Sequence, residues 1–486
     1  MNYLMVMRML GIVGLIMAAA MVPSLLFTVV EDAVVSPLCF LSPILFCLVL
    51  GYAGMRHKIE IDQKRLSIRG GVAFLGIGWL LFSVISAIPY YASGMFTIPK
   101  ALFESASALT TTGVSAMADG SMYPASLVLW HDISQWLGGI GAILIFAVLL
   151  PQLGTSAANL FSAEVQGNSA ERTMPRSREA VTLLFRLYAV TTVVQTAILM
   201  LLGQPFKMAL RLSAATISTS GYIYSKAYLA QCDSLLLELV LIVFMLIGSG
   251  NFILYYRLTQ KRFRLFEEDT ERRWYTGFLV LFTVLVTFNL WKNDYYTVTE
   301  SLRHGLFTVV SMMSTTGLGT EDFSQWPAFS RLLLFYGAII GGCSASTAGG
   351  MKVSRVVVLL KVCWQEIKRT LHPNMVSVIT MSGKVVPTAA IVGVGRYFFL
   401  YFIVFMLLTM VYSLTGSGML ESMATVVVFL SNVGSAYGIM GEATSFAGLT
   451  GFGYIVLYVT MIMGRIELFA LIMFFHPDFW NRKRSW

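Results

Sequence analysis

The chain carries the string Thr110-Thr111-Thr112-Gly113-Val114 and three variants of it. These are Ser218-Thr219-Ser220-Gly221-Tyr222, Ser314-Thr315-Thr316-Gly317-Leu318 and Ser431-Asn432-Val433-Gly434-Ser435. Each string ends an apolar segment too short to cross a bilayer, and the four recur at intervals of about a hundred residues. A cation filter aims rows of backbone carbonyls at a bare ion, and glycine permits the backbone angles that turn them inward. Four such strings predict an ion pore.

The composition indicates a membrane protein. Of 486 residues, 57% are hydrophobic and 12% are charged, against roughly 25% charged in an average soluble domain. Several apolar runs reach the ~20 residues needed to span hydrocarbon. We interpret the first run, 5–29, as a span rather than a signal peptide, because no cleavage site and polar domain follow it and a second run opens at residue 37. The five cysteines have no metal-ligand spacing and are expected to be free packing residues: Cys39, Cys47, Cys232, Cys343 and Cys363.

The distribution of charge predicts the orientation. Basic residues crowd alternate connections and the C-terminus: Arg56, Lys58, Lys64, Arg65, Arg69; Arg172, Arg176, Arg178; Arg257, Lys261, Arg262, Arg264, Arg272, Arg273; Lys352, Arg355, Lys361, Lys368, Arg369; and Arg482, Lys483, Arg484. Because positive loops face the cytoplasm, both termini are predicted to be cytoplasmic and the four strings to open outside. The net charge of +9 is explained by an anionic leaflet, so no nucleic acid is expected as a partner.

The hydropathy pattern predicts an all-α polytopic membrane protein with ten spans. Two extra transmembrane helices, near 5–29 and 37–56, precede four pseudo-repeated span–pore helix–span units around one pore. Leading spans are expected near 72–92, 181–203, 274–292 and 393–414, half-helices near 98–110, 206–217, 298–312 and 418–430, and closing spans near 128–150, 235–257, 329–362 and 452–476. The resulting divisions are 1–70 for the first two spans and 71–165, 166–265, 266–375 and 376–486 for repeats one to four.

A half-helix that ends inside a membrane must end in protein beside a water-filled cavity. Each half-helix is expected to enter from outside and to direct the negative end of its dipole toward the pore centre, which favours a cation. Carbonyls and hydroxyls of the strings supply oxygen ligands suited to a hard cation. The predicted filter residues are Thr111, Thr112, Gly113, Thr219, Ser220, Gly221, Thr315, Thr316, Gly317, Asn432, Val433 and Gly434. The fourth string departs from the Thr-Gly pattern, which puts the symmetry of the ion sites in doubt rather than the filter.

Three further stretches, together with the strings, resemble the Trk/Ktr/HKT potassium transporter superfamily, most closely the bacterial Trk pore-forming subunit (TrkH type). The stretches are Ser134-Gln135-Trp136-Leu137-Gly138-Gly139-Ile140-Gly141, Gly341-Gly342-Cys343-Ser344-Ala345-Ser346-Thr347-Ala348-Gly349-Gly350-Met351-Lys352 and Met463-Gly464-Arg465-Ile466-Glu467. The resemblance covers nearly the whole chain, including the two extra leading spans. It implies K⁺ as the transported ion, a bacterial inner-membrane location, a separate cytosolic nucleotide-binding regulatory subunit (TrkA type) and a homodimer.

The glycine-bracketed loop has two interpretations. The span that contains it is too long for one crossing, and unwound backbone at membrane depth must line a cavity or be buried. We expect a gate under the third filter string, formed by Gly341, Gly342, Ser344, Ser346, Thr347, Gly349, Gly350 and Lys352. The alternative is a tight helix crossing that uses the glycines for packing.

Arg465 is an ionised group inside a span, and such a group usually faces a cavity or a partner. It is interpreted as a pore charge below the filter; alternatively it ties span ends through Glu467 or backbone carbonyls. Glu104, Glu300 and Glu421 lie in or beside half-helices, where they either concentrate cations at the outer mouth or bond backbone amides. The sequence leaves these alternatives open.

Other classes of protein receive little support. No recurring set of acids, histidines or a nucleophile indicates an enzyme, and the histidines have no ligand spacing. A carrier with inverted repeats would show paired broken helices. The chain contains no Walker-type loop or dinucleotide fingerprint, so no nucleotide site is expected in it. Potassium uptake through a gated filter is the preferred function; the alternatives are Na⁺- or H⁺-coupled K⁺ symport and a non-selective monovalent cation pathway.

Overall fold

The structure is a computed structural model that describes residues 3–30, 34–56, 68–116, 123–145, 177–223, 228–375, 377–434, 446–466, 468, 472–473 and 476–480. Several residues invoked above lie outside these ranges: Lys58, Lys64, Arg65, Arg172, Arg176, Ser435, Glu467, the basic residues 482–484 and both chain ends. The side chain of Arg178 and the end of the predicted 128–150 span are also outside the description.

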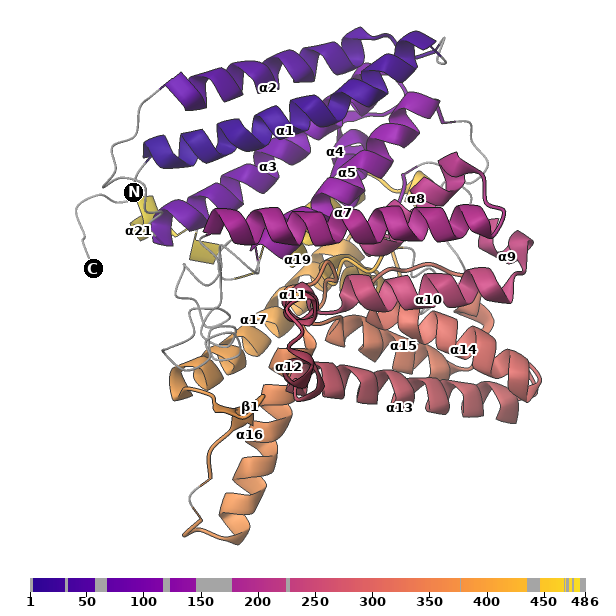
Figure 1. Cartoon of the computed structure of the whole chain (residues 1–486), viewed down its shortest axis with the longest axis vertical. Helices are drawn as coiled ribbons and strands as arrows, with labels where there is room; N and C mark the ends of the chain where they lie inside the picture. The colour runs from indigo at the N-terminus through magenta and orange to yellow at the C-terminus, as the bar shows by residue number, and fades with distance from the viewer. Residues whose placement is uncertain are drawn as a thin grey trace.

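Two long helices open the fold, α1 (Tyr3–Val30) and α2 (Leu38–Arg56), and pack against each other as a hairpin (Figure 1). Glycines let their backbones approach closely: a Cβ added to Gly54 would lie 2.6 Å from the carbonyl oxygen of Met7. α1 also packs on α3 and α5, which joins the hairpin to the rest of the bundle.

Four groups of three helices follow, each with a long helix, a short helix and a closing helix. The groups are α3 (Ile68–Ala92), α4 (Ile98–Leu109) and α5 (Ala125–Leu144); α7 (Ser177–Leu201), α8 (Phe206–Ile217) and α10 (Leu235–Ser249); α13 (Thr270–Lys292), α14 (Val298–Met313) and α15 (Ala328–Ile340); and α17 (Thr388–Ser413), α18 (Met419–Leu430) and α19 (Gly451–Arg465). The short helices have 12, 12, 16 and 12 residues. At 1.5 Å per residue they are all shorter than the roughly 30 Å of hydrocarbon.

The groups close into a ring. Each short helix packs on the closing helix of the group before it: α8 on α5, α14 on α10, α18 on α15 and, completing the circle, α4 on α19. Aromatic side chains fill the junction that joins the first and last groups, where the Phe103 ring lies 5.7 Å from that of Phe429 and 5.2 Å from that of Tyr454. The ring brings the C-terminal ends of the four short helices toward one region.

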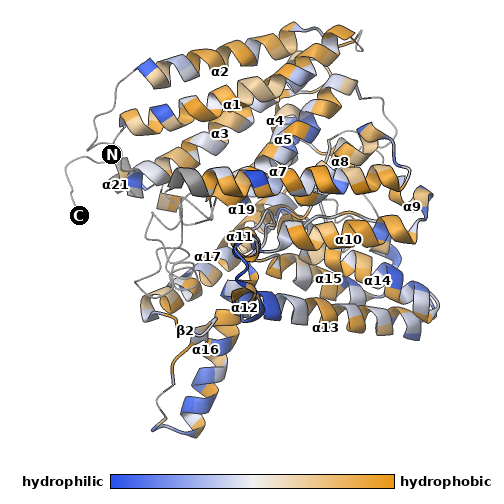
Figure 2. Ribbon diagram, viewed as in Figure 1, coloured by the Kyte–Doolittle hydropathy of each residue, from blue (hydrophilic) through white to orange (hydrophobic). Residues whose placement is uncertain are grey.

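Six helices are long and apolar enough to cross a membrane among the residues the structure describes: α1, α2, α3, α7, α13 and α17. The number becomes seven if α10 and the following α11 (Phe252–Thr259) form one bent span. Many large apolar residues of the long helices are exposed, and the ribbons of these helices are coloured mostly as hydrophobic in Figure 2. The predicted all-α membrane fold is confirmed, whereas the count of ten crossings stays a prediction.

Two predicted closing spans are broken by a bend or a loop, and in a third, predicted at 452–476, the helix α19 ends at Arg465 and part of the remainder lies outside the described residues. The span predicted at 235–257 was wrong as a single helix, because α10 and α11 meet at an angle of 96°. Asn251 caps α11 by accepting a hydrogen bond from the amide of Ile253 at 2.9 Å, and the amide of Phe252 donates to the Ala345 carbonyl at 3.2 Å. The span predicted at 329–362 consists of α15, a loop and α16 (Val353–Leu371), which projects from the body in Figure 1.

Small elements complete the described chain. They are α9 (Tyr228–Cys232), α12 (Phe263–Glu267), α21 (Pro477–Trp480), the 3₁₀ turns Phe323–Gln325 and Phe446–Gly448, and a hairpin of β1 (Thr380–Met381) and β2 (Lys384–Val385) paired antiparallel. The hairpin was not predicted. Its turn residue Ser382 bonds α13, with the Ser382 amide donating to Thr270 Oγ1 at 2.7 Å and the Thr270 amide donating to Ser382 Oγ at 3.1 Å.

Candidate ion filter and intramembrane loop

The four strings share one backbone conformation. The second residue of each is left-handed, with φ of 56° at Thr111, 54° at Thr219, 58° at Thr315 and 51° at Asn432. The glycine is left-handed too, with φ of 71°, 65°, 73° and 75° at Gly113, Gly221, Gly317 and Gly434. Positive φ is uncommon for residues other than glycine, so its recurrence at four matched positions indicates a common construction.

Hydrogen bonds to the half-helices hold this conformation. In the first string the amides of Thr112 and Gly113 both donate to the carbonyl oxygen of Ser107, at 2.9 and 3.2 Å. The second and third strings repeat the pattern at Ala215 and Ser311, and the amide of Val433 donates to Val428 at 3.0 Å in the fourth. Because these bonds use the amides of the strings, the carbonyl oxygens of the strings stay available for other contacts.

Carbonyl oxygens of different strings meet around the glycines. A Cβ added to Gly434 would overlap the carbonyl oxygen of Thr112 and lie 2.9 and 3.3 Å from those of Ser220 and Thr316. A Cβ at Gly113 would overlap the Ser220 oxygen in the same way. The structure therefore brings all four strings together, and side chains larger than hydrogen have no room at these glycines.

The departure in the fourth string has a structural explanation. Asn432 Nδ2 donates to Thr112 Oγ1 at 3.0 Å and to the Met461 carbonyl at 3.1 Å, so this side chain joins the fourth string to the first string and to α19. The backbone keeps the common conformation although the Thr pair is absent. The fourth string therefore breaks the symmetry of the four strings in its side chains and not in its backbone conformation.

The string hydroxyls divide into two kinds. Thr110 Oγ1 and Thr112 Oγ1 lie 2.8 Å apart and bond within the first string, and the third string has the same pair between Ser314 and Thr316 at 2.7 Å. The hydroxyls of Thr111 and Ser220 are buried and have no hydrogen-bond partner among the described residues. Buried polar atoms are normally hydrogen-bonded, so these two oxygens can serve a ligand.

The loop between α15 and α16 contacts three of the helix groups directly and is linked to the first group through Arg465. Thr347 Oγ1 shares its hydroxyl between the carbonyls of Ile217 at 2.9 Å and Gly248 at 2.8 Å. The Gly349 amide donates to Thr315 Oγ1 at 2.8 Å, and a Cβ at Gly349 would overlap the Ser431 carbonyl oxygen. The loop thus lies directly against the second, third and fourth half-helix ends, and Arg465 provides the link to the first group.

Arg465 is buried, with 4% of its surface exposed. Its guanidinium donates to the carbonyl of Thr347 in the loop at 2.9 Å and to the carbonyl of Gly138 in α5 at 3.1 Å. Of the two interpretations of this residue, the tie to backbone carbonyls is present in the structure. The same contacts place a positive group beside the loop.

The remaining predicted loop residues shape its ends. Gly341 and Gly350 have φ of 71° and 76°, and the Gly342 carbonyl accepts from the amide of Val353 at 3.1 Å. Ser346 Oγ donates to the Cys343 carbonyl at 2.5 Å. Lys352 is buried, has φ of 77° and donates from Nζ to the Ala348 carbonyl.

Glu271 is a loop partner that the sequence analysis missed. Its Oε1 accepts from the Ser344 amide at 2.7 Å, from Ser344 Oγ at 3.0 Å and from the Ser354 amide at 3.1 Å. This carboxylate therefore holds the start of the loop and the start of α16 together. Its position at the first turn of an apolar span was the available signal, because an acid there requires a partner.

The glutamates of the half-helices have different environments. Glu104 is fully buried and accepts a hydrogen bond from the Ala116 amide at 2.9 Å. Glu300 completes a capping box with Thr297 at the exposed start of α14, and Glu421 is exposed in the first turn of α18. The amide-bonding interpretation therefore applies to Glu104 and Glu300, while the structure gives Glu421 no described partner.

Ionic contacts reinforce two junctions of the ring. Arg211 in α8 donates from Nε to Asp132 in α5 at 2.8 Å. Arg303 in α14 bonds both carboxylate oxygens of Glu238 in α10, at 2.8 and 2.9 Å. At the closing junction the Lys100 ammonium of α4 lies 5.7 Å from the centre of the Tyr454 ring.

Fold and site together define a polytopic helical membrane protein of the ion-transport class. A model of the TrkH family, described as cation transport protein, matches residues 43–482, and the chain belongs to this family. Potassium uptake proteins named TrkH of the Trk system are similar to it: one from Halomonas elongata is 30% identical, over 99% of this chain and 100% of the relative. Another from Escherichia coli is 31% identical, over 86% and 88%. The crystal structure of the potassium transporter TrkH from Vibrio parahaemolyticus matches with a TM-score of 0.87 at 27% identity, over 99% of this chain and 100% of that one.

Proposed function

We propose that the chain carries K⁺ across the bacterial cytoplasmic membrane through a filter built from the four strings and gated by the loop 341–352. The observation that carries the proposal is the meeting of carbonyl oxygens from Thr112, Ser220 and Thr316 beside Gly434. Rings of backbone carbonyls replace the hydration shell of K⁺ in filters of this kind. The relatives named as potassium uptake proteins support the choice of ion.

In this proposal the filter residues act mainly through their backbone. Carbonyls of the strings coordinate the ion, and the hydroxyls of Thr111 and Ser220, which have no hydrogen-bond partner in the described part of the chain, add oxygens at its edge. Gly113, Gly221 and Gly434 are required because a carbonyl oxygen of another string occupies the space of a Cβ at each. The dipoles of the half-helices add negative potential where their C-terminal ends converge.

The loop is proposed to block the path below the filter. Its backbone is non-helical at membrane depth, which is tolerated where it lines a cavity or is buried. Thr347 and Arg465 hold it in the blocking position, and the guanidinium charge adds an electrostatic barrier to a cation. Conduction requires these contacts to break together.

The orientation and the partners belong to the same proposal. The basic connections support an orientation with both termini and α16 in the cytoplasm and the open side of the strings outside. The chain is divided at 70, 165, 265 and 375 into the leading pair and four repeats. Regulation comes from a cytosolic nucleotide-binding subunit of the TrkA type, and the pore subunit forms a homodimer; the Trk-system names of the relatives support the first of these.

Fluxes in proteoliposomes test the proposal. Purified protein is reconstituted with gradients of K⁺, Rb⁺ or Na⁺, and uptake is followed with and without a Na⁺ or H⁺ gradient. We expect K⁺ and Rb⁺ to move down their own gradients and Na⁺ to be excluded. Uptake that depends on a Na⁺ or H⁺ gradient would indicate coupled symport instead, and equal fluxes of Na⁺ and K⁺ would refute a selective filter.

A further inference from the structure

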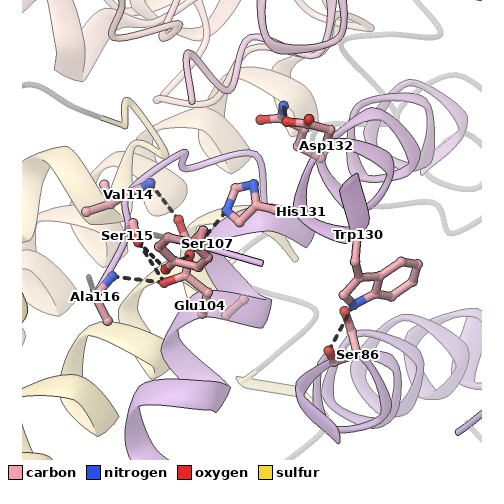
Figure 3. Close-up of polar contacts among 12 residues, drawn as sticks. Ser86, Glu104, Ser107, Val114, Ser115, Ala116, Trp130, His131 and Asp132 are labelled. Carbon is pink, nitrogen blue, oxygen red and sulfur yellow. Dashed lines mark hydrogen bonds and ion pairs between the residues drawn. The ribbon is translucent and has the colours of Figure 1, made fainter. Parts of the chain in front are cut away.

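A buried carboxylate lies behind the first string, at a place where the other three half-helices have none. Glu104 Oε2 accepts from the Ala116 amide at 2.9 Å and from Ser115 Oγ at 3.2 Å, while Oε1 accepts from the Tyr123 hydroxyl at 3.2 Å. Figure 3 shows Glu104 between this outgoing segment and the start of α5. The matching positions, counted back from each glycine, hold Leu212, Thr308 and Thr425.

A histidine without a hydrogen-bond partner faces the same carboxylate. His131 is buried, and neither ring nitrogen has a hydrogen-bond partner among the described residues. Its Nε2 lies 3.8 Å from Glu104 Oε1, which is too long for a hydrogen bond (Figure 3). Its ring lies against that of Tyr222, the residue after Gly221, with centroids 3.8 Å apart and the ring planes tilted by 31°. The pair therefore connects the first string to the second.

Other ionisable groups around the pair have their own contacts. Asp132, the neighbour of His131 on α5, pairs with Arg211 of α8 at 2.8 Å. Lys100, on α4 itself, lies over the Tyr454 ring of α19. The phenols near Glu104 come from α3, the segment before α5, the second string and α19: Tyr90, Tyr123, Tyr222 and Tyr454. His131 is the basic group aligned with Oε1.

We propose that Glu104 and His131 bind one proton between Oε1 and Nε2, and that this proton controls conduction through the first two strings. The proton comes from bulk water and returns to it. With the proton absent, the carboxylate charge acts on the filter through a low dielectric and attracts K⁺. With the proton bound, the pair is neutral and Oε1 turns toward His131, away from Tyr123. The inference rests on the proposed K⁺ pathway.

The experiment measures K⁺ flux in proteoliposomes as the external pH is varied. Wild-type flux is expected to fall as the pH falls through the titration of the pair. Glu104→Gln keeps an acceptor for the Ala116 amide but has no charge, so its flux is expected to stay at the acid level of the wild type with the pH dependence lost. His131→Gln is expected to shift the midpoint of the pH profile. Glu300→Gln is the matched control, because glutamine also serves in a capping box, and it should keep the wild-type profile.

Infrared difference spectra give a readout that needs no transport. Acidification should produce the band of a protonated carboxyl group in the wild type and in Glu300→Gln, and the band should be missing in Glu104→Gln. Wild-type pH dependence or an unchanged band in Glu104→Gln, or an unchanged midpoint in folded His131→Gln, overturns the inference. If the protein selects K⁺ but these variants behave as wild type, the inference fails and the filter stands; if Na⁺ passes as readily as K⁺, the proposed function fails independently of the infrared result.

Discussion

Replacing Thr347 by valine isolates one hydroxyl that holds the intramembrane loop in place. Valine has nearly the shape of threonine, so Thr347→Val leaves no cavity and removes only the hydroxyl shared between the carbonyls of Ile217 and Gly248. The Thr347 amide still donates to Gly248 at 3.2 Å, so the loop backbone keeps one of its anchors. The change therefore weakens the position of the loop without dismantling its surroundings.

The magnitude follows from that single hydroxyl. An intramolecular hydrogen bond contributes about 0.5–1.5 kcal/mol net, and a buried carbonyl that loses its donor costs about 1–3 kcal/mol. Both penalties apply to the blocking position alone, because the displaced loop would leave these carbonyls to water in either variant. A shift of about 1–3 kcal/mol corresponds to about a 5- to 150-fold change in the ratio of open to closed protein.

Basal Rb⁺ uptake into proteoliposomes, without any regulatory subunit, is the assay. Thr347→Val is expected to raise the basal rate within that range, whereas Thr347→Ser keeps the hydroxyl and should remain close to wild type. Thermal unfolding and a monodisperse elution profile establish that each variant is folded. An unchanged or lower rate in folded Thr347→Val, or an equal rise in Thr347→Ser, would refute the assignment of the loop as a gate.

Three further predictions concern the filter and its supports. Gly113→Ser is expected to lower the K⁺/Na⁺ uptake ratio about tenfold, because its Cβ overlaps the Ser220 carbonyl and backbone strain costs of order 1–3 kcal/mol; an unchanged ratio would contradict the filter assignment. Arg465→Lys keeps the charge but cannot span two carbonyls, so basal uptake should rise, and a rate equal to wild type would argue for a purely electrostatic role. Asn432→Thr restores the common pattern yet removes both side-chain bonds, and denaturant titration should show a loss of about 1–3 kcal/mol of stability, which an unchanged midpoint would disprove.

The half-helices could be predicted because their signals are local. Proline stands at or beside the start of the first two, at Pro99 and Pro205, where the missing amide costs no helical hydrogen bond. The apolar run of each then stops at a hydroxyl-rich string. As a result the four predicted ranges agree with α4, α8, α14 and α18 to within one residue at each end.

The bend after α10 could not be found in the same way. The apolar run resumes after Gly248-Ser249-Gly250-Asn251, and small residues inside such a run fit a tightly packed straight helix as well as a bent one. The change of direction depends on a tertiary contact, the bond from the Phe252 amide to Ala345 in a loop far along the chain. The hydrophobic periodicity of a sequence does not reveal a contact of this kind.

In the candidate site, too, the segments with local sequence signals could be predicted and the long-range contacts could not. The strings and the loop glycines can be recognised from local composition, and the structure places the loop against the strings. The partners of the site cannot be recognised in this way. Glu271, His131 and the side chain of Asn432 contact residues that lie more than seventy positions away or on another helix. Their residue types were visible in the sequence, but their roles depend on which helices the ring places side by side.

The ring has one junction built differently from the others. Cationic side chains of α4, α8 and α14 reach the preceding group, whereas α18 contains no lysine or arginine that could extend to α15. α15 is also the helix that leads into the loop. The free-energy cost of moving one helix relative to its neighbour is lowest where no ion pair has to be broken. If the loop moves as the proposed gate requires, we expect the seam between the third and fourth groups to open first, because no cationic side chain of α18 ties it to α15.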